Sequence, residues 1–303
     1  MVSAIVPVFN AENTLVRAVD SILIQPEVDE LILVEDGSTD RSLELCRLLE
    51  SRHRKIKVLQ HPRGGNRGAP ESRNLGLSFA KNEWIQFMDA DDQLLPGKIS
   101  DQLSRVKDGV DLILGKVIYI NQDGSESLIN PFKDVWSGLI ATRLGYTSSI
   151  LWRKSAVIKA GGWDVNLLNI QEYNLIFSML KLGSKVNYSN LGLTRVYFLA
   201  NSITNSSEVV KEKRDHYFKF REEIRNYLIE KKQFTLKRRH HFNSVSGLML
   251  KYHQPEFKVN LDRFYFWLYS KVRSIKKTSR SLKIGISGVL ILLFISILIK
   301  MIL

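Results

Sequence analysis

The N-terminal part of the chain alternates between short apolar runs and longer stretches with helical spacing of apolar residues. Four apolar runs have the length of strands: 2–9, 30–35, 56–60 and 83–88. Three intervening stretches carry apolar residues three or four positions apart: 12–24, 39–51 and 70–80. Strands that alternate with such helices are typical of βαβ units. The sequence therefore predicts an α/β fold with a mostly parallel sheet, whose ligands bind at the carboxyl ends of the strands.

The pattern continues less regularly toward the C-terminus. It predicts, in order, a helix at 98–107, a strand at 111–120, a loop-rich region at 121–145, a strand and short helix within 146–160, a helix at 171–182, one or two strands within 185–200 and a charged helix at 207–232. We expect a catalytic domain at 1–206, followed by a basic helical region at 207–283.

Composition and charge narrow the class of protein. The hydrophobic fraction of 44% is ordinary for a folded chain. Cys46 is the single cysteine and lies in an apolar helical pattern, which excludes a disulfide-built secreted domain. The net charge is +13, yet acidic and basic residues balance over 1–206, so the surplus lies in 207–283 apart from Lys300. This distribution argues against a nucleic-acid-binding face on the main domain.

The chain ends in an apolar segment, IGISGVLILLFISILIKMIL, at 284–303. A helix of that length spans about 30 Å, the thickness of a bilayer core. The segment predicts a transmembrane helix, with a buried core helix as the alternative. Aromatic and basic residues at 258–275 suit a helix in the membrane interface. Six basic residues at 271–283 precede the span, so the positive-inside bias predicts that the catalytic domain faces the cytoplasm.

Three carboxylates crowd the end of the fourth predicted strand. Asp89, Asp91 and Asp92 lie within four residues, where their charges repel one another unless they share a cation. Hard oxygen ligands of this kind suit Mg²⁺ or Mn²⁺, which completes its shell with substrate phosphates. The alternative is an acidic turn that caps the next helix. Taken alone, the cluster does not separate the two interpretations.

An ordered set of motifs surrounds the acidic cluster. The set comprises Val6-Pro7-Val8-Phe9-Asn10, Val34-Glu35-Asp36-Gly37-Ser38-Thr39-Asp40, Ser72-Arg73-Asn74-Leu75-Gly76, Met88-Asp89-Ala90-Asp91-Asp92, Gly161-Gly162-Trp163-Asp164 and Gln171-Glu172-Tyr173-Asn174-Leu175. In this order the motifs closely resemble the family 2 glycosyltransferases, over about residues 1–200. The resemblance implies a GT-A fold, a nucleotide-sugar donor and a divalent metal ion.

The resemblance also implies roles on the donor side. Pro7, Phe9 and Asn10 would line the pocket for the base and ribose, Asp36 would accept a hydrogen bond from the base, and Arg73 would lie near the nucleotide.

The acidic cluster would take the rest of the donor. Asp89 would bind the ribose, with Ala90 beside it in the substrate site. Asp91 would bind Mn²⁺ or Mg²⁺, which bridges the diphosphate. A divalent cation stabilises the negative charge that develops as a nucleoside diphosphate leaves.

The general base departs from the usual pattern of the resembled family. Members commonly carry Glu-Asp, whereas this chain has Gln171-Glu172. Glu172 would then take the proton from the acceptor hydroxyl, and Gln171 could only form hydrogen bonds. The alternative is that Glu172 serves its helix as an early acidic residue.

The leading hypothesis is a membrane-anchored, metal-dependent, inverting glycosyltransferase that acts on a glycan or lipid-linked acceptor near anionic lipids. A dinucleotide-dependent oxidoreductase shares the βαβ pattern, but the first turn, 7–12, lacks the glycine-rich fingerprint. A catalytically silent sugar-nucleotide-binding or scaffold protein is the remaining alternative, favoured only by Gln171-Glu172.

Several residues near the motifs have two interpretations. The loop with Arg63, Gly64, Gly65 and Arg67 is either a lid over the diphosphate or a turn-rich connection. Trp152 and Trp163 either border an acceptor pocket or pack in the core. His61 lies in a basic stretch, and we expect it to be solvated.

Overall fold

The computed structural model describes residues 1–62, 64–197 and 207–250. The chain divides into two compact units, Met1–Lys213 and Arg214–Leu303.

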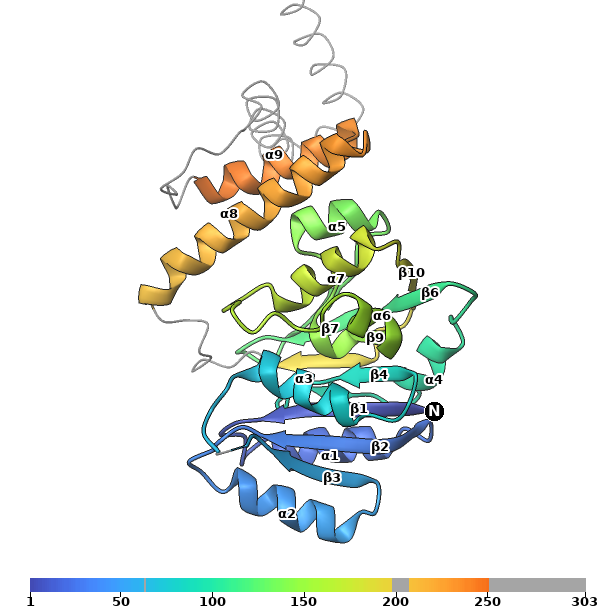
Figure 1. The fold of residues 1–303 in the computed structure, drawn as a ribbon, viewed down its shortest axis with the longest axis vertical. Coiled ribbons are helices and arrows are strands. Elements are labelled where there is room, and N and C mark those ends of the chain that lie inside the picture. Colours follow the sequence, from blue (N-terminus) through green and yellow to red (C-terminus); the bar gives the residue numbers. More distant parts are fainter. Residues whose placement is uncertain (63, 198–206, 251–303) are drawn as a thin grey trace, which may run out of the picture. The chain divides into compact units, whose positions relative to one another are not determined.

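The N-terminal half of the first unit confirms the predicted alternation of strands and helices (Figure 1). Its strands are β1 (Val2–Val8), β2 (Val28–Glu35), β3 (Ile56–Gln60) and β4 (Trp84–Phe87). Its helices are α1 (Leu15–Leu23), α2 (Ser42–Arg52) and α3 (Ala69–Phe79). All three pairings among these strands, β1 with β2, β1 with β4 and β2 with β3, are parallel, so their carboxyl ends share one edge.

The rest of the unit contains shorter elements. They are β5 (Gln93–Leu94), α4 (Lys98–Leu103), β6 (Val110–Leu114), β7 (Val117–Ile120), β8 (Glu126–Ile129), α5 (Val135–Ala141), a 3₁₀ turn η1 (Thr147–Ser149), β9 (Ile150–Arg153), α6 (Lys154–Lys159), α7 (Gln171–Lys181), β10 (Lys185–Tyr188) and β11 (Thr194–Tyr197). A seven-stranded sheet has the order β10-β6-β9-β4-β1-β2-β3, and a four-stranded sheet has the order β5-β11-β7-β8. In the larger sheet, β9 runs antiparallel to both neighbours.

The prediction of a single strand at 111–120 is wrong. Strand β6 ends at Leu114, and after Gly115 the chain continues as β7 of the second sheet. The backbone N–H of Gly115 donates to the carbonyl oxygen of Ser149 at 2.9 Å. A Cβ at this glycine would lie 2.8 Å from the same oxygen, which leaves no room for a side chain. The region 121–145 is also less loop-like than expected, since it contains β8 and α5.

The two faces of the larger sheet bury different residues of β1. Ala4 and Val6 belong to the core cluster that includes α1 and α2 residues. On the opposite face, α3 packs so closely that a Cβ at Gly76 would lie 2.4 Å from Cγ2 of Ile5. Cys46 belongs to the core cluster on the α1 and α2 side of the sheet. Burial raises the pKa of its thiol to about 12, as expected for a cysteine that packs in the core.

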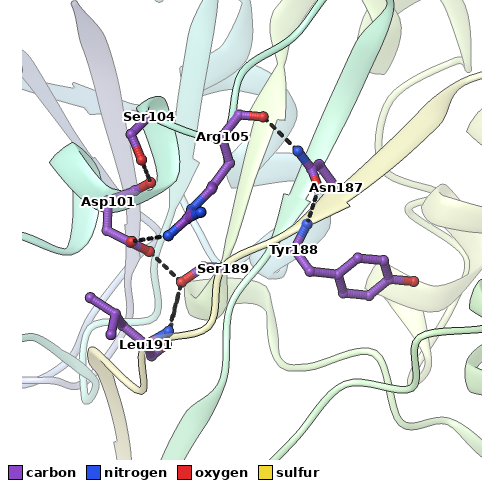
Figure 2. A network of polar contacts seen from close by, with 7 residues as sticks. All are labelled: Asp101, Ser104, Arg105, Asn187, Tyr188, Ser189 and Leu191. Atoms are coloured by element: carbon purple, nitrogen blue, oxygen red, sulfur yellow. Dashed lines mark hydrogen bonds and ion pairs between the residues drawn. The ribbon is translucent and has the colours of Figure 1, made fainter.

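A polar network fastens α4 to the end of β10 (Figure 2). The carboxylate of Asp101 accepts hydrogen bonds from Arg105, at 3.3 Å, and from the hydroxyl of Ser189. The side-chain amide of Asn187 donates to the carbonyl oxygen of Arg105 at 2.8 Å. Ser189 in turn accepts from the backbone N–H of Leu191, so the network fixes the segment that leads from β10 toward β11.

The described part of the second unit is helical. Helix α8 (Ser207–Glu230) begins in the first unit and continues into the second, and α9 (Leu236–Leu250) follows it. Within residues 1–62, 64–197 and 207–250, no helix is long and apolar enough to cross a membrane. The predicted interfacial helix at 258–275 and the predicted span at 284–303 lie outside these residues. The expected domain division at 206 and 283 therefore stays a prediction.

Candidate active site

The buried guanidinium of Arg73 joins three segments that are distant in sequence. Its side chain, on α3, is 5% exposed. One terminal nitrogen donates to Asp89, at the end of β4, at 2.6 Å. The other donates to Oε1 of Gln171, at the start of α7, at 3.1 Å. The ring of Trp163 lies 4.5 Å from the guanidinium carbon, in cation–π geometry.

The neighbouring Asn74 fastens the turn that carries Trp163. Its side-chain oxygen accepts from the backbone N–H of Trp163, and its amide donates to the carbonyl of the same residue, both at 2.8 Å. Gly162 has φ +73° and a virtual Cβ 2.7 Å from Oδ1 of Asn74, so the turn requires glycine. Trp152 and Trp163 are buried with Phe87 in an aromatic cluster, which supports the core interpretation for both tryptophans.

The three clustered carboxylates after β4 do not share one environment. Asp89 is 41% exposed at its side chain and pairs with Arg73. Asp92 is buried, accepts a hydrogen bond from the hydroxyl of Ser148 and has its pKa raised well above the ordinary value by burial. Asp92 bonds to Ser148 in the interior and so does not share the half-exposed surroundings of Asp89. Ala90, between them, is buried.

Asp91 has the properties of a single carboxylate ligand. Burial, together with the charge of Asp89, raises the pKa of its carboxyl to about 6. In the part of the chain that the structure describes, no group of three or more His, Cys, Asp or Glu side chains could hold a metal ion. Mg²⁺ is usually held by one or two carboxylates and by substrate phosphates rather than by a full protein cage. A partly desolvated carboxylate beside a second one therefore fits a cation that arrives with a diphosphate.

Glu172 lies in the first turn of α7, next to the residue that binds Arg73. It keeps some accessible surface, and desolvation raises the pKa of its carboxyl to about 7. Arg73 acts to lower this pKa and Asp89 to raise it, which places Glu172 in the field of both groups. A carboxyl group with this pKa is a competent proton acceptor at neutral pH.

The end of β1 meets the turn after β2. The side-chain oxygen of Asn10 accepts from the backbone N–H of Thr39 at 2.8 Å, and its backbone N–H donates to the hydroxyl of Ser38 at 3.1 Å. Asn10 has φ +49°, a left-handed conformation that asparagine tolerates. Phe9 beside it is exposed and Pro7 is partly buried, so these residues form an accessible strand end near Asp36.

Asp36 is engaged within the protein. Its two oxygens accept backbone N–H groups from Arg67 and Gly68, at 2.7 and 2.9 Å. The ring nitrogen Nε2 of His61 lies 3.4 Å from one oxygen and 2.9 Å from the hydroxyl of Ser72. The expectation that His61 is solvated is wrong, because its side chain is 4% exposed. One nitrogen serves both contacts, so the three residues do not form a relay of the Ser-His-Asp kind.

The loop over this cluster is held at its C-terminal end by Asp36. A Cβ at Gly37, which has φ +75°, would lie 2.6 Å from the carbonyl carbon of Gly65, so the loop touches the turn after β2. Arg63 lies outside the described residues. The choice between lid and connection stays open for the remaining residues of this loop.

Two residues of the site had no signal in the sequence. Ser148, in the 3₁₀ turn η1, accepts the backbone N–H of Asp89 at 3.1 Å and donates to Asp92. Arg17, on α1, donates to the backbone carbonyl of Asp91 at 2.6 Å. Both contact the backbone of the acidic loop, the segment Asp89–Asp92. Contacts of this kind follow no spacing rule in the sequence.

Comparison with known proteins agrees with this geometry. The model of the Glycosyl transferase family 2 matches residues 3–159, about half of the chain. A protein of Haemophilus influenzae called an uncharacterized glycosyltransferase is 25% identical over 95% of this chain and 96% of its own length. Glycosyltransferase GlyG of Streptococcus pneumoniae is 35% identical, over 42% of this chain and 41% of that protein. The succinoglycan biosynthesis protein ExoU of Rhizobium meliloti is 33% identical, over 40% of this chain and 34% of that protein.

Solved structures share the fold at low sequence identity. Residues 1–349 of TarS from S. aureus, in complex with UDP, have a TM-score of 0.59 at 18% identity, covering 82% of this chain and 72% of that one. The mannosyltransferase PcManGT from Pyrobaculum calidifontis, in complex with GDP-Man and Mn²⁺, has a TM-score of 0.58 at 13% identity, covering 82% and 74%. These likenesses confirm the predicted α/β fold of the GT-A type.

Replacing Glu172 by Gln should raise the free energy of unfolding, and more at about pH 8 than at about pH 5. The folded-state pKa of about 7 lies above the ordinary value of 4.5, so the folded chain binds this proton more tightly than the unfolded chain. The carboxyl therefore costs little stability below about pH 4.5 and its full cost above about pH 7. Because the residue is partly exposed, we expect a gain of about 1–3 kcal/mol at pH 8.

Urea unfolding of the wild type and the variant at both pH values measures the difference. Glu71→Gln, in the first turn of α3, is the matched control for the loss of a first-turn carboxylate. If the free energy of unfolding differs between wild type and Glu172→Gln by the same amount at both pH values, the raised pKa of Glu172 is contradicted.

Proposed function

The chain belongs to the glycosyl transferase family 2, and on that premise we propose that it transfers a hexosyl group from a nucleotide-sugar donor to a hydroxyl group of a glycan or lipid-linked acceptor. We further propose that the transfer inverts the anomeric carbon and is assisted by Mn²⁺ or Mg²⁺. The observation that carries the proposal is the meeting of Glu172, Arg73 and Asp89 at the strand ends. The similarity to a succinoglycan biosynthesis protein supports a role in making cell-surface polysaccharide or glycoconjugate.

Glu172 acts as the general base in this proposal. The acceptor hydroxyl oxygen forms a bond to the anomeric carbon while its proton moves to the Glu172 carboxylate. The bond between the anomeric carbon and the donor phosphate oxygen breaks, and its electron pair leaves with the nucleoside diphosphate. One base and one displacement invert the configuration. A pKa of about 7 leaves a large fraction of Glu172 ionised at neutral pH and able to accept the proton.

The residues at the strand ends hold the donor. Asp91 would bind the cation, with Asp89 beside it at the ribose. The cation supplies positive charge that stabilises the leaving diphosphate. The exposed Phe9 and the neighbouring Pro7 and Asn10 would contact the base and ribose. Asp36 would accept a hydrogen bond from the base. The backbone N–H groups of Arg67 and Gly68 use one lone pair on each carboxylate oxygen, and the others remain for the base.

Replacing Glu172 by Gln should lower the rate of transfer by about 10²–10⁴-fold, because the amide cannot accept the proton. Donor binding should stay within about threefold, since the amide fills the same volume. Initial rates and donor affinity are measured with the same donor and Mn²⁺. In the wild type, the rate should rise with pH through about 7. A variant that keeps near-normal turnover would show that Glu172 is not the base. Wild-type protein that binds donor but neither transfers nor hydrolyses it would favour the silent binding protein.

Replacing Asp91 by Asn should abolish the part of nucleotide binding that depends on Mn²⁺. The amide oxygen is a weaker ligand for a hard cation than a carboxylate. Calorimetry with UDP, GDP and dTDP, each with and without Mn²⁺, measures the effect and identifies the preferred base. Asp20→Asn, at an exposed position of α1, is the matched control. Unchanged Mn²⁺-dependent binding in Asp91→Asn would contradict the metal role.

The C-terminal sequence supports a membrane-bound enzyme. We propose that 284–303 spans the bilayer and that anionic lipids bind the basic block before it, the basic helical region at 207–283. We also propose that the catalytic domain faces the cytoplasm. Each Lys or Arg near an anionic surface contributes about 1 kcal/mol. This arrangement would bring the strand-end site close to a lipid-linked acceptor.

Deleting 284–303 should weaken membrane association without abolishing it at low salt, because the basic block remains. High salt should then release the truncated protein, since it screens the attraction to anionic headgroups. Membrane fractionation of both forms at low and high salt tests this. Full-length protein in the soluble fraction would contradict the span. Protease cleavage of the catalytic domain only from the non-cytoplasmic side would contradict the orientation.

A further inference from the structure

Helix α1 holds the acidic loop from the side opposite Arg73. Two of its polar side chains, and a third that follows the helix, contact the backbone that follows β4. Arg17 donates to the carbonyl oxygen of Asp91 at 2.6 Å, and the hydroxyl of Ser21 accepts from the N–H of Leu94 at 3.1 Å. Gln25, which follows the helix, donates to the carbonyl oxygen of Leu95 at 3.0 Å. The segment from Asp91 to Leu95 is therefore aligned along this helix.

Arg17 is itself held by an aromatic ring from a distant strand. Its guanidinium carbon lies 3.9 Å from the ring centre of Tyr197, on β11. The hydroxyl of Tyr197 donates to Oε1 of Gln93 at 2.9 Å, in the strand that directly follows the acidic loop. The ring packs against the guanidinium, which at the same time donates an N–H to the Asp91 carbonyl. This contact defines the backbone orientation of Asp91.

We infer that Arg17, stacked on Tyr197, is a positioning residue that sets the geometry of Asp91 for the cation-bound diphosphate of the donor. The contact is with the backbone, so Arg17 leaves both carboxylate oxygens of Asp91 to the ligand. Its positive charge lies beside the acidic loop, as that of Arg73 does at Asp89. The inference rests on the proposed metal role of Asp91.

The experiment compares Arg17→Met with the wild type in the full-length chain. The nucleotide is whichever of UDP and GDP stabilises the wild type more, held at saturation while Mn²⁺ is titrated. We expect the Mn²⁺ concentration that gives half of the thermal shift to rise about tenfold or more, the usual effect of losing a hydrogen bond from a charged donor. In a separate assay with the sugar donor, the maximal rate of transfer at saturating Mn²⁺ should stay within about threefold of the wild-type rate. Nucleotide binding without Mn²⁺ should not change.

Further variants separate positioning from general destabilisation. Arg17→Lys keeps a charged donor and should recover part of the Mn²⁺ affinity. Tyr197→Phe keeps the ring and should behave as wild type, whereas Tyr197→Leu should shift the Mn²⁺ response in the same direction as Arg17→Met. The double variant of Arg17→Met with Tyr197→Leu should be no worse than Arg17→Met alone, because the ring acts through Arg17.

Arg105→Met is the matched control, since Arg105 is also a half-buried arginine that donates to one partner, Asp101, outside the site. An unchanged Mn²⁺ response in Arg17→Met, or a loss of maximal rate without a shift in that response, would overturn the inference. So would a shift of equal size in Arg105→Met. If Asp91→Asn abolishes the Mn²⁺ response and Arg17→Met leaves it unchanged, the inference alone fails. If Asp91→Asn also leaves it unchanged, the metal role of Asp91 fails and the positioning role fails with it.

Discussion

The buried charge of Arg73 is the interaction on which the site depends. A guanidinium stays protonated in a protein, so burying it requires partners for its charge and its N–H groups. Its Nε has no hydrogen-bond partner among the described residues, but its two terminal nitrogens donate to Asp89 and Gln171 and its charge faces the ring of Trp163. These three partners belong to the end of β4, to α7 and to the turn before α7. A single side chain on α3 thereby connects three segments that are distant in sequence.

The neutral partner of Arg73 bears on the proposed role of Glu172 as the base, because position 171 lacks the acidic residue usual in the family. Gln171 accepts a hydrogen bond from Arg73 but adds no charge. Arg73 therefore has one ionised contact, Asp89, and its field also reaches Glu172, where it opposes the effects of burial and of Asp89. An acid at position 171 would add a negative charge next to the base and raise its pKa further. The departure from the common pattern is thus electrostatically consistent with a pKa near neutrality.

The sequence predicts the layout of the site better than its contacts. Strand periodicity and helix spacing locate β1 to β4 and α1 to α3, because each is long enough to show a full pattern and parallel strands must share an edge. The break at Gly115 escapes prediction, since both sides of the glycine read as one apolar run and only packing against Ser149 separates them. Asp36 directly follows β2, as the strand predicted at 30–35 implies, yet its bonds to Arg67 and Gly68 depend on a loop conformation that has no periodicity.

The acidic loop shows why the remaining contacts of the site cannot be predicted from the sequence. Asp89, Asp91 and Asp92 are close in sequence, but Asp89 pairs with Arg73, Asp92 bonds to Ser148, and Asp91 is partly buried near Asp89. What separates them is a set of bonds to backbone atoms, from Ser148 on one side and Arg17 on the other. These bonds hold carboxyl groups with raised pKa values in a partly desolvated place, which costs stability at neutral pH. In the proposed reaction, a cation bound with the donor would offset that cost, and the free energy gained would add to the affinity for the charged ligand.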